Sequence, residues 1–428
     1  MNKITFDTIE ETIYTKVLAN GLHVFLHPKK DVSKVYGVFT TNYGSIDRSF
    51  IPINETEEVT VPDGVAHFLE HKLFEKEDYD VMDLFSKQGA SPNAYTSFTK
   101  TAYLFSTTDL ATKNIETLLN YVQEPYFSDA SVEKEKGIIV QELNMYEDQP
   151  DWRSFMGTIK NMFHHHPVKI DILGTEESIN SITKEDLYTC YHTFYHPQNM
   201  ALFVTGNFDL EEMTSLIETN QAEKNFAEIE PIEKGIYEEP RSVAREESTI
   251  HLPVSIPKVT IGIKESANIL RGEALLKREV LQTMLLDYYF SPSGKFYEKL
   301  YDEELIDDSF EYSTTVEESF AFSLISSNTS EPDQFIKRVK QLLLQTNDEK
   351  ISQEDFDIMK KKQIGAILRS MNSLEFIANQ YIHYHFLNID FFEVNSFIEQ
   401  LRVEDLNEFL KTWIEEDKLT VCRVENES

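Results

Sequence analysis

Residues 63–75 read DGVAHFLEHKLFE, a short apolar run that carries two histidines and a glutamate. Its apolar residues recur at the spacing of one helix face, so the run predicts an α-helix with Asp63 as the N-cap. On that helix His67 and His71 are about one turn apart, and Glu70 lies beside them. The stretch therefore predicts a helix that aims two imidazoles and a carboxylate at one place.

The order His67-Phe68-Leu69-Glu70-His71 is the inverse of the His-Glu-x-x-His motif and is the inverzincin signature. Two histidines at positions i and i+4 can reach one zinc ion, with the glutamate beside them. The alternative is a helix with two partly exposed histidines, which the apolar neighbours disfavour because they predict a largely buried helix. We therefore expect one Zn²⁺ per chain.

A catalytic zinc site needs a third protein ligand and an open position for water. The predicted helix at 129–148 offers five acidic candidates: Glu133, Glu135, Glu142, Glu147 and Asp148. Glu135 and Glu142 are seven residues apart, which places them two turns apart on a shared face. Spacing alone does not choose among these residues, because an acidic, solvated helix face explains the same pattern.

Composition narrows the class of partner. The 428 residues include 40 basic and 74 acidic side chains, a formal net charge of -34, which argues against nucleic acid or an anionic membrane as partner. The acidic surface permits basic substrates, and solubility alone also explains it. With only Cys190 and Cys422, no apolar signal segment at the N-terminus and no run of membrane-spanning length, we expect a soluble cytoplasmic protein.

The order of predicted elements in the first half recurs in the second half. The hairpin pattern at 91–108 and the two helices that follow it have counterparts beyond residue 308. A polar, acidic stretch at 221–248 predicts a linker. We expect an α+β fold with a zinc-binding catalytic domain at 1–220 and a homologous domain at 249–428, which is inactive because it lacks the histidine motif.

Three stretches carry a resemblance to a known family: HFLEHKLFEKED from residue 67, FSKQGASPNAYTSFTKTAYLFS from residue 85 and EKEKGIIVQELNMYED from residue 133. The chain resembles the pitrilysin/insulysin (inverzincin) zinc metallopeptidases, in the subfamily of mitochondrial processing peptidase, and is most similar to its YmfH-type bacterial members. The resemblance covers the whole chain and is most specific at 60–210. It implies two α/β-roll domains, each an antiparallel-rich sheet packed against helices.

The resemblance also assigns roles to individual residues. It implies that His67, His71 and Glu142 bind zinc, that Glu70 is the general base and that Glu135 assists. In the family, the strand that corresponds to Asn93, Ala94 and Tyr95 is an open sheet edge, to which a peptide substrate adds as a further strand. The sequence alone equally permits an ordinary internal hairpin strand here.

The second half departs from the family pattern. Active members carry an Arg and a Tyr that hold the substrate, and the matching positions in SGKFYEKLYDEELIDDSF (293–310) are Tyr301 and Asp308. We therefore expect a zinc endopeptidase subunit for short, unfolded or leader-like peptides. A homologous subunit without zinc would supply the Arg/Tyr pair in a clamshell heterodimer. Two alternatives stay open: a self-sufficient homodimeric peptidase and a non-catalytic scaffold.

Overall fold

The computed structural model describes residues 1–6, 9–265 and 269–427. The chain forms two compact units. The first comprises Met1–Leu143, Asp171–Ile236 and Ser370–Phe386, and the second Asn144–Ile170, Tyr237–Arg369 and Leu387–Ser428. Each unit thus combines segments from both halves of the sequence, unlike the contiguous ranges 1–220 and 249–428.

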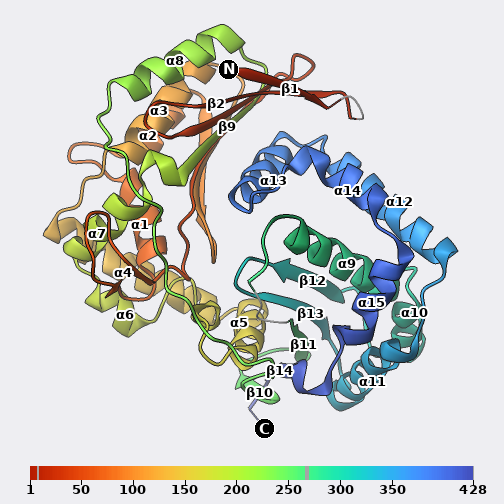
Figure 1. Cartoon of the computed structure of the whole chain (residues 1–428). Helices are drawn as coiled ribbons and strands as arrows, with labels where there is room; N and C mark the ends of the chain where they lie inside the picture. The colour runs from red at the N-terminus through yellow and green to blue at the C-terminus, as the bar shows by residue number, and fades with distance from the viewer. Residues whose placement is uncertain (7–8, 266–268, 428) are drawn as a thin grey trace. The chain divides into compact units, whose positions relative to one another are not determined.

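Among the described residues, the first unit holds a seven-stranded sheet in the order β1-β2-β3-β9-β4-β8-β7 (Figure 1). The strands β3 and β9 are parallel, and every other neighbouring pair is antiparallel. β7 pairs with β8 alone and is an edge strand. The bounds are β1 Asn2–Phe6, β2 Glu11–Val17, β3 His23–Pro28, β4 Val35–Thr41, β7 Ala90–Thr96, β8 Thr101–Thr107 and β9 Met200–Gly206, beside a small pair, β5 Ser49–Phe50 and β6 Val59–Thr60.

Helices cover the β7 end of this sheet. α1 and α2 pack on β7, α3 packs on β8 and β4, α7 packs on α1, and α8 packs on α3. The bounds are α1 Val65–Phe74, α2 Val81–Lys87, α3 Ala111–Gln123, α4 Asp129–Glu147, α6 Glu176–Ser181, α7 Lys184–Phe194 and α8 Leu210–Ala222, with short 3₁₀ turns at η1 Pro167–Lys169 and η2 Pro197–Asn199.

Within its described residues, the second unit has a five-stranded sheet in the order β10-β14-β11-β13-β12, again with one parallel pair, β10 and β14. This order reproduces β3-β9-β4-β8-β7, so the predicted internal repeat and the α+β fold class are confirmed. The strands are β10 Glu247–His251, β11 Lys258–Lys264, β12 Glu311–Val316, β13 Ala321–Asn328 and β14 Leu419–Glu425. The helices of the second half are α9 Gly272–Phe290, α10 Lys295–Asp302, α11 Pro332–Gln345, α12 Gln353–Ser370, α13 Leu374–Phe386, α14 Val394–Gln400 and α15 Val403–Trp413, with 3₁₀ turns at η3 Thr346–Asp348, η4 Phe391–Glu393 and η5 Glu416–Lys418.

The two halves exchange one helix each. Helix α5 (Pro150–Met162), which follows α4 in the first half, packs on β10, β11 and β14 of the second unit. Helix α13, which follows α12 in the second half, packs on β4 and β9 of the first unit, where Figure 1 draws it in blue beside the red and green strands. The two helices are equivalent elements of the repeat. The sheet of the first half is therefore covered by the helix from the second half, α13, and the sheet of the second half by the helix from the first half, α5.

Helix α1 begins at Val65 because Gly64 turns the chain. Gly64 has φ 91°, in the left-handed region that favours glycine, and a Cβ there would lie 2.2 Å from the Leu173 carbonyl oxygen. The predicted N-cap at Asp63 is wrong. No side-chain hydrogen bond caps the helix, and the Asp63 carboxylate instead pairs with Arg48 at 3.2 Å.

The segment between the two units is held at both ends. Up to Ile236 it belongs to the first unit, where Lys234 Nζ lies 3.0 Å from Asp47 Oδ2. From Tyr237 it belongs to the second, where the Glu239 carboxylate accepts the backbone N–H groups of residues 164–166 and pairs with Lys264 at 2.7 Å. The boundary between the two units, Ile236 to Tyr237, lies inside the predicted linker, 221–248.

Over the described ranges, the longest apolar stretch of any helix falls short of what a bilayer crossing requires.

Candidate metal centre

Three side chains meet where α1 and α4 come together. His71 Nε2 lies 3.3 Å and His67 Nε2 lies 3.8 Å from the same oxygen, Glu142 Oε2. One ligand atom from each residue lies within 4.8 Å of the other two. The two rings stand edge to face with centroids 4.6 Å apart. Of the five carboxylates that the sequence left open as a third partner, the structure therefore brings Glu142 to both histidines.

These distances fit a zinc ion. Ligand atoms that bind tetrahedral zinc at about 2.0–2.1 Å are about 3.3 Å apart, close to the 3.3 and 3.8 Å between Glu142 Oε2 and the two imidazole nitrogens. Two imidazoles and one carboxylate are also the donor set of many hydrolytic zinc sites, which keep a fourth position open. The Nδ1 atom of His67 is buried and has no hydrogen-bond partner among the described residues, so nothing competes for the orientation of that ring. The residues present therefore fit the ion.

The surroundings shift the pKa values of His67 and His71 in opposite directions. Burial, reinforced by the neighbouring His71, lowers the pKa of His67 to about 4, so this imidazole is neutral and able to coordinate. Burial alone would lower the pKa of His71, but its hydrogen bonds with Glu135 and Glu142 raise it to about 10. The bond to Glu135 joins Nδ1 and Oε1 at 3.0 Å. Glu135 is thus placed to fix the ring through the nitrogen that does not face Glu142.

Glu70 lies on the same helix but outside this cluster. Its Oε2 atom accepts a 2.7 Å hydrogen bond from Thr96 Oγ1, at the end of the edge strand β7. Burial raises the pKa of Glu70, while the Thr96 bond works against that rise. A carboxylate with a raised pKa beside a metal cluster suits proton transfer.

The register of the β7–β8 hairpin shows which backbone groups of β7 are free. Ser97 N–H donates to the Lys100 carbonyl, so in the antiparallel ladder the alternate residues Pro92, Ala94 and Thr96 turn their backbone groups away from β8. The Ala94 N–H is bonded only by the side chain of its neighbour, Asn93 Oδ1, at 2.9 Å. The open edge runs directly past Thr96 and therefore past Glu70.

The three residues predicted to contact the substrate, Asn93, Ala94 and Tyr95, differ in the direction of their backbone groups. Ala94 faces the open edge with its backbone groups. The backbone groups of Asn93 and Tyr95 alternate with those of Ala94 and point toward β8. Tyr95 Oη donates to Asn379 Oδ1 of α13 at 3.1 Å. The sequence did not point to Thr96 or Asn379. Asn379 lies 284 residues from Tyr95, and no local pattern signals such a contact.

The second unit contains no counterpart of the cluster among its described residues. Tyr301 lies on α10 with 59 % of its surface exposed and stacks on Tyr297, and Asp308 is exposed in the turn before β12. Neither side chain is a cation, so neither position offers a fixed positive charge to a carbonyl oxygen that becomes negative.

Comparisons with known proteins place these features in a family. Residues 54–176 match the model described as "Insulinase (Peptidase family M16)", and residues 181–363 match "Peptidase M16 inactive domain". The zinc protease YmfH of Bacillus subtilis is 47% identical over 421 residues, 98% of each chain. An M16-like peptidase from Alicyclobacillus acidocaldarius has a similar crystal structure, with TM-score 0.93, 39% identity and coverage of 97% of this chain and 98% of the other. A Helicobacter pylori protease at 18% identity, covering 97% and 99% of the two chains, shares the fold with TM-score 0.82.

Proposed function

The chain belongs to the insulinase family of peptidases (Peptidase family M16), and on this basis we propose that it is the zinc-binding, catalytic subunit of an endopeptidase that cuts short or unfolded peptides. The observation that carries the proposal is the convergence of one ligand atom each from His67, His71 and Glu142 within 4.8 Å, beside the half-buried side chain of Glu70. His67, His71 and Glu142 would hold one Zn²⁺.

A bound zinc ion would act as a Lewis acid that polarises the scissile carbonyl and makes water more acidic. The chain's own residues supply the rest. Glu70 accepts the proton of the attacking water at its carboxylate and delivers it to the leaving amine. Glu135 holds His71 through Nδ1, and Thr96 holds Glu70. The peptide lies extended on the open edge of β7, where the carbonyls of Pro92 and Ala94 face outward. The Ala94 N–H also faces this edge and pairs with the peptide once it leaves the side chain of Asn93.

The proposal includes a homologous partner without zinc. The sequence positions where active relatives carry the Arg/Tyr pair hold Tyr301 and Asp308 here, so neither position supplies a fixed cation for the negative charge that develops on the carbonyl oxygen. A partner that closes with this chain as a clamshell would bring it. A cytoplasmic location also belongs to the proposal, supported by two buried, unpaired cysteines.

Replacing Glu70 by Gln tests the catalytic assignment. We expect Glu70→Gln to bind one zinc per chain, measured by elemental analysis, and to lose peptidase activity by a factor of about 10² or more. Glu133→Gln is the matched control, because this α4 side chain is 70% exposed and pairs with Lys136 outside the cluster. Near-normal hydrolysis by Glu70→Gln would show that Glu70 is not the general base. Loss of zinc from the unaltered chain, or a zinc-loaded pair without peptidase activity, would favour a scaffold.

The partner is tested by assaying a peptide mixture with the purified chain alone and then with the product of the neighbouring homologous gene. We expect weak activity alone and a large increase on mixing. Full activity of the chain alone would instead support the self-sufficient homodimer.

A further inference from the structure

The second unit has a cavity of about 280 Å³ between helices α9 and α12. In the internal repeat, these two helices correspond to α1 and α4, which carry the metal cluster of the first unit. All residues that line the cavity belong to the second unit, and the catalytic assignments above use none of them. Its volume is at the lower end of the range for small-molecule pockets, so it suits a small ligand.

Helix α10 begins at the wall of this cavity with an uncapped first turn. Its N-cap residue is Gly294, so no side chain at that position accepts a hydrogen bond from the helix. Ser293 and Lys295, on either side of Gly294, both line the cavity. The free N–H groups at the start of a helix carry a partial positive charge and attract anions. The first turn of α10 therefore favours an anion at this wall.

Ser291 is an independent indication of a ligand. This residue lines the cavity and is only 4% exposed, and its hydroxyl forms no hydrogen bond with another described residue. A buried hydroxyl without a partner costs free energy, because it gives up its hydrogen bonds with water on folding. The Ser291 carbonyl accepts the Gly294 N–H at 2.6 Å, which folds the loop and brings Ser291 next to the start of α10. A ligand at that point would satisfy the hydroxyl.

The charged groups of the cavity leave a cation with the weakest pairing. Lys362 Nζ lies 2.8 Å from Asp287 Oδ2, and Tyr312 Oη donates to the other oxygen of Asp287 at 2.6 Å. Lys295, in contrast, has only a 3.7 Å contact with the Glu349 carboxylate. The groups of the cavity that lack a close partner are therefore hydrogen-bond donors: the Lys295 ammonium, the Ser291 hydroxyl and the first-turn N–H groups of α10.

Asp355 is the one carboxylate that opposes an anion here. Its Oδ2 atom accepts hydrogen bonds from Ser352 Oγ at 2.8 Å and from Tyr288 Oη at 3.4 Å, in the first turn of α12. These two donors and the start of α12 offset part of its charge. Asp355 therefore reduces the attraction for an anion, which gives a test with the opposite sign.

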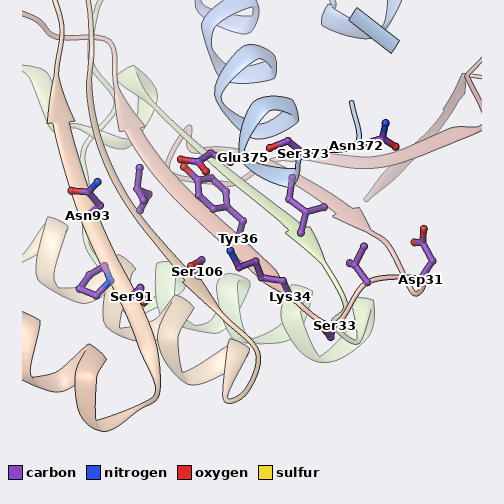
Figure 2. A pocket seen from close by; sticks show the side chains of 14 residues that line it. Asp31, Ser33, Lys34, Tyr36, Ser91, Asn93, Ser106, Asn372, Ser373 and Glu375 are labelled. Atoms are coloured by element: carbon purple, nitrogen blue, oxygen red, sulfur yellow. The ribbon is translucent and has the colours of Figure 1, made fainter. Parts of the chain in front are cut away.

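The larger cavity of the first unit, about 720 Å³, shows a different arrangement (Figure 2). Helix α13 begins at its wall, but Ser373 Oγ accepts the Phe376 N–H at 3.2 Å and so caps the first turn. A lysine, Lys34, also lines this cavity. A lysine and a helix start thus occur together in both cavities, and the uncapped turn and the buried Ser291 hydroxyl distinguish the cavity of the second unit.

We propose that the cavity between α9 and α12 binds a small oxyanion, a phosphate or carboxylate group, at the start of α10. The anion accepts hydrogen bonds from the Ser291 hydroxyl and from the first-turn N–H groups, and the Lys295 ammonium balances its charge. The ligand is a small molecule that carries such a group, because the cavity has no room for a larger one. The site is built from residues of the second unit alone and does not depend on the peptidase function proposed above.

A titration with inorganic phosphate tests the site. The line width of the ³¹P NMR signal reports binding to the zinc-loaded chain at constant ionic strength, and we expect a Kd of about 1 mM. Ser291→Ala and Lys295→Gln should each weaken binding about tenfold, and Asp355→Asn should tighten it about threefold. Lys34→Gln is the matched control, the same charge change on an exposed lysine of the first unit, and should leave the Kd unchanged.

The Ser291 variant also separates binding from folding. Without phosphate it should unfold at the same temperature as the unaltered chain, because its hydroxyl has no partner to lose. Acetate and neutral acetamide then identify the anion. Displacement of phosphate by acetate, but not by acetamide, shows that the site takes carboxylates as well, whereas phosphate that acetate does not displace assigns the site to phosphate ligands.

Two results would overturn the proposal. The first is the absence of phosphate binding at concentrations well above about 1 mM. The second is phosphate binding that Ser291→Ala and Lys295→Gln both leave unchanged, since the anion would then lie elsewhere on the protein, for example at the zinc ion.

Discussion

Thr96 Oγ1 donates a 2.7 Å hydrogen bond to Glu70 Oε2 and so joins the edge strand β7 to helix α1. The same residue turns its backbone groups to the open edge of the sheet. One threonine therefore contacts the carboxylate assigned as general base and borders the path proposed for the peptide. This arrangement makes Thr96 a positioning residue that acts through Glu70.

Replacing Thr96 by Val removes the hydroxyl and keeps the β-branched shape. We expect kcat to fall about tenfold, the value of one hydrogen bond to a charged group, with KM little changed. Thr96→Ser restores the hydroxyl and should recover most of the rate. Both variants should bind one zinc ion, because Thr96 does not touch His67, His71 or Glu142. A Val variant with unchanged kcat, or one whose KM alone rises, would show that the bond does not position the base.

Glu135 acts on the metal site through His71. The Glu135→Gln variant weakens the 3.0 Å contact with His71 Nδ1 and should lower zinc affinity about 10–100-fold, as loss of a charged partner behind a histidine ligand does elsewhere. Competition against a chromophoric chelator measures this. Glu133→Gln, two residues earlier on the exposed face of α4, should bind zinc like the unaltered chain. An affinity for the Glu135 variant within twofold of normal would mean that Glu142 and the fold alone orient His71.

Replacing either of two glycines near the site by alanine should change the stability of the protein, in opposite directions. Gly64 has a positive φ and no room for a Cβ, so Gly64→Ala should destabilise the protein by at least about 2 kcal/mol. Gly137 lies within helix α4, and a Cβ there meets nothing within 4 Å, so Gly137→Ala should stabilise it by about 0.5–1 kcal/mol. Thermal unfolding of both variants gives the comparison. A destabilised Gly137 variant or a neutral Gly64 variant would contradict the backbone argument.

The sequence predicted the local features of the site well. The motif on α1 follows from helical spacing, and the repeat of elements predicted two similar sheets, because both signals are periodic along the chain. The sequence alone left five acidic residues open as the partner of the histidines, since an exposed acidic helix has the same pattern. Only the packing of α4 against α1 brings Glu142, and not Glu133, to His71.

Long-range arrangement was not predictable from these patterns. Strands β3 and β4 are consecutive in the sequence, yet β9 lies between them in the sheet. The exchange of α5 and α13 is equally invisible, because an amphipathic helix fits either of two homologous sheets. Asn379 on α13 bonds both Tyr36 and Tyr95, contacts that exist only because of this exchange. These contacts could therefore not be predicted from the sequence.

The buried ion pair of Glu239 and Lys264 in the second unit predicts a specific dependence of stability on pH. The side chains of Glu239 and Lys264 are 1% and 0% exposed and 2.7 Å apart. Burial tends to raise the pKa of Glu239, but hydrogen bonds from Lys264 and from the backbone N–H groups of residues 164–166 outweigh it and lower the pKa to about 2. Because the folded pKa is below the ordinary value of 4.5, this group stabilises the fold fully above pH 4.5, and the effect is lost as pH falls toward 2.

Glu239→Gln leaves Lys264 buried without its anion and should lower the free energy of unfolding by about 3 kcal/mol at pH 7. Urea unfolding at several pH values measures how this difference changes. We expect the difference in unfolding free energy to shrink steadily between pH 4.5 and 3. In this range Glu239 of the unaltered chain becomes protonated in the unfolded state but stays ionised in the folded state, so folding must release a proton, which costs free energy. Glu238→Gln makes the same charge change on an exposed neighbour and should show almost no difference at any pH. A Glu239 difference that stays constant from pH 7 to 3 would show that shape and hydrogen bonding, and not the charge, stabilise this segment.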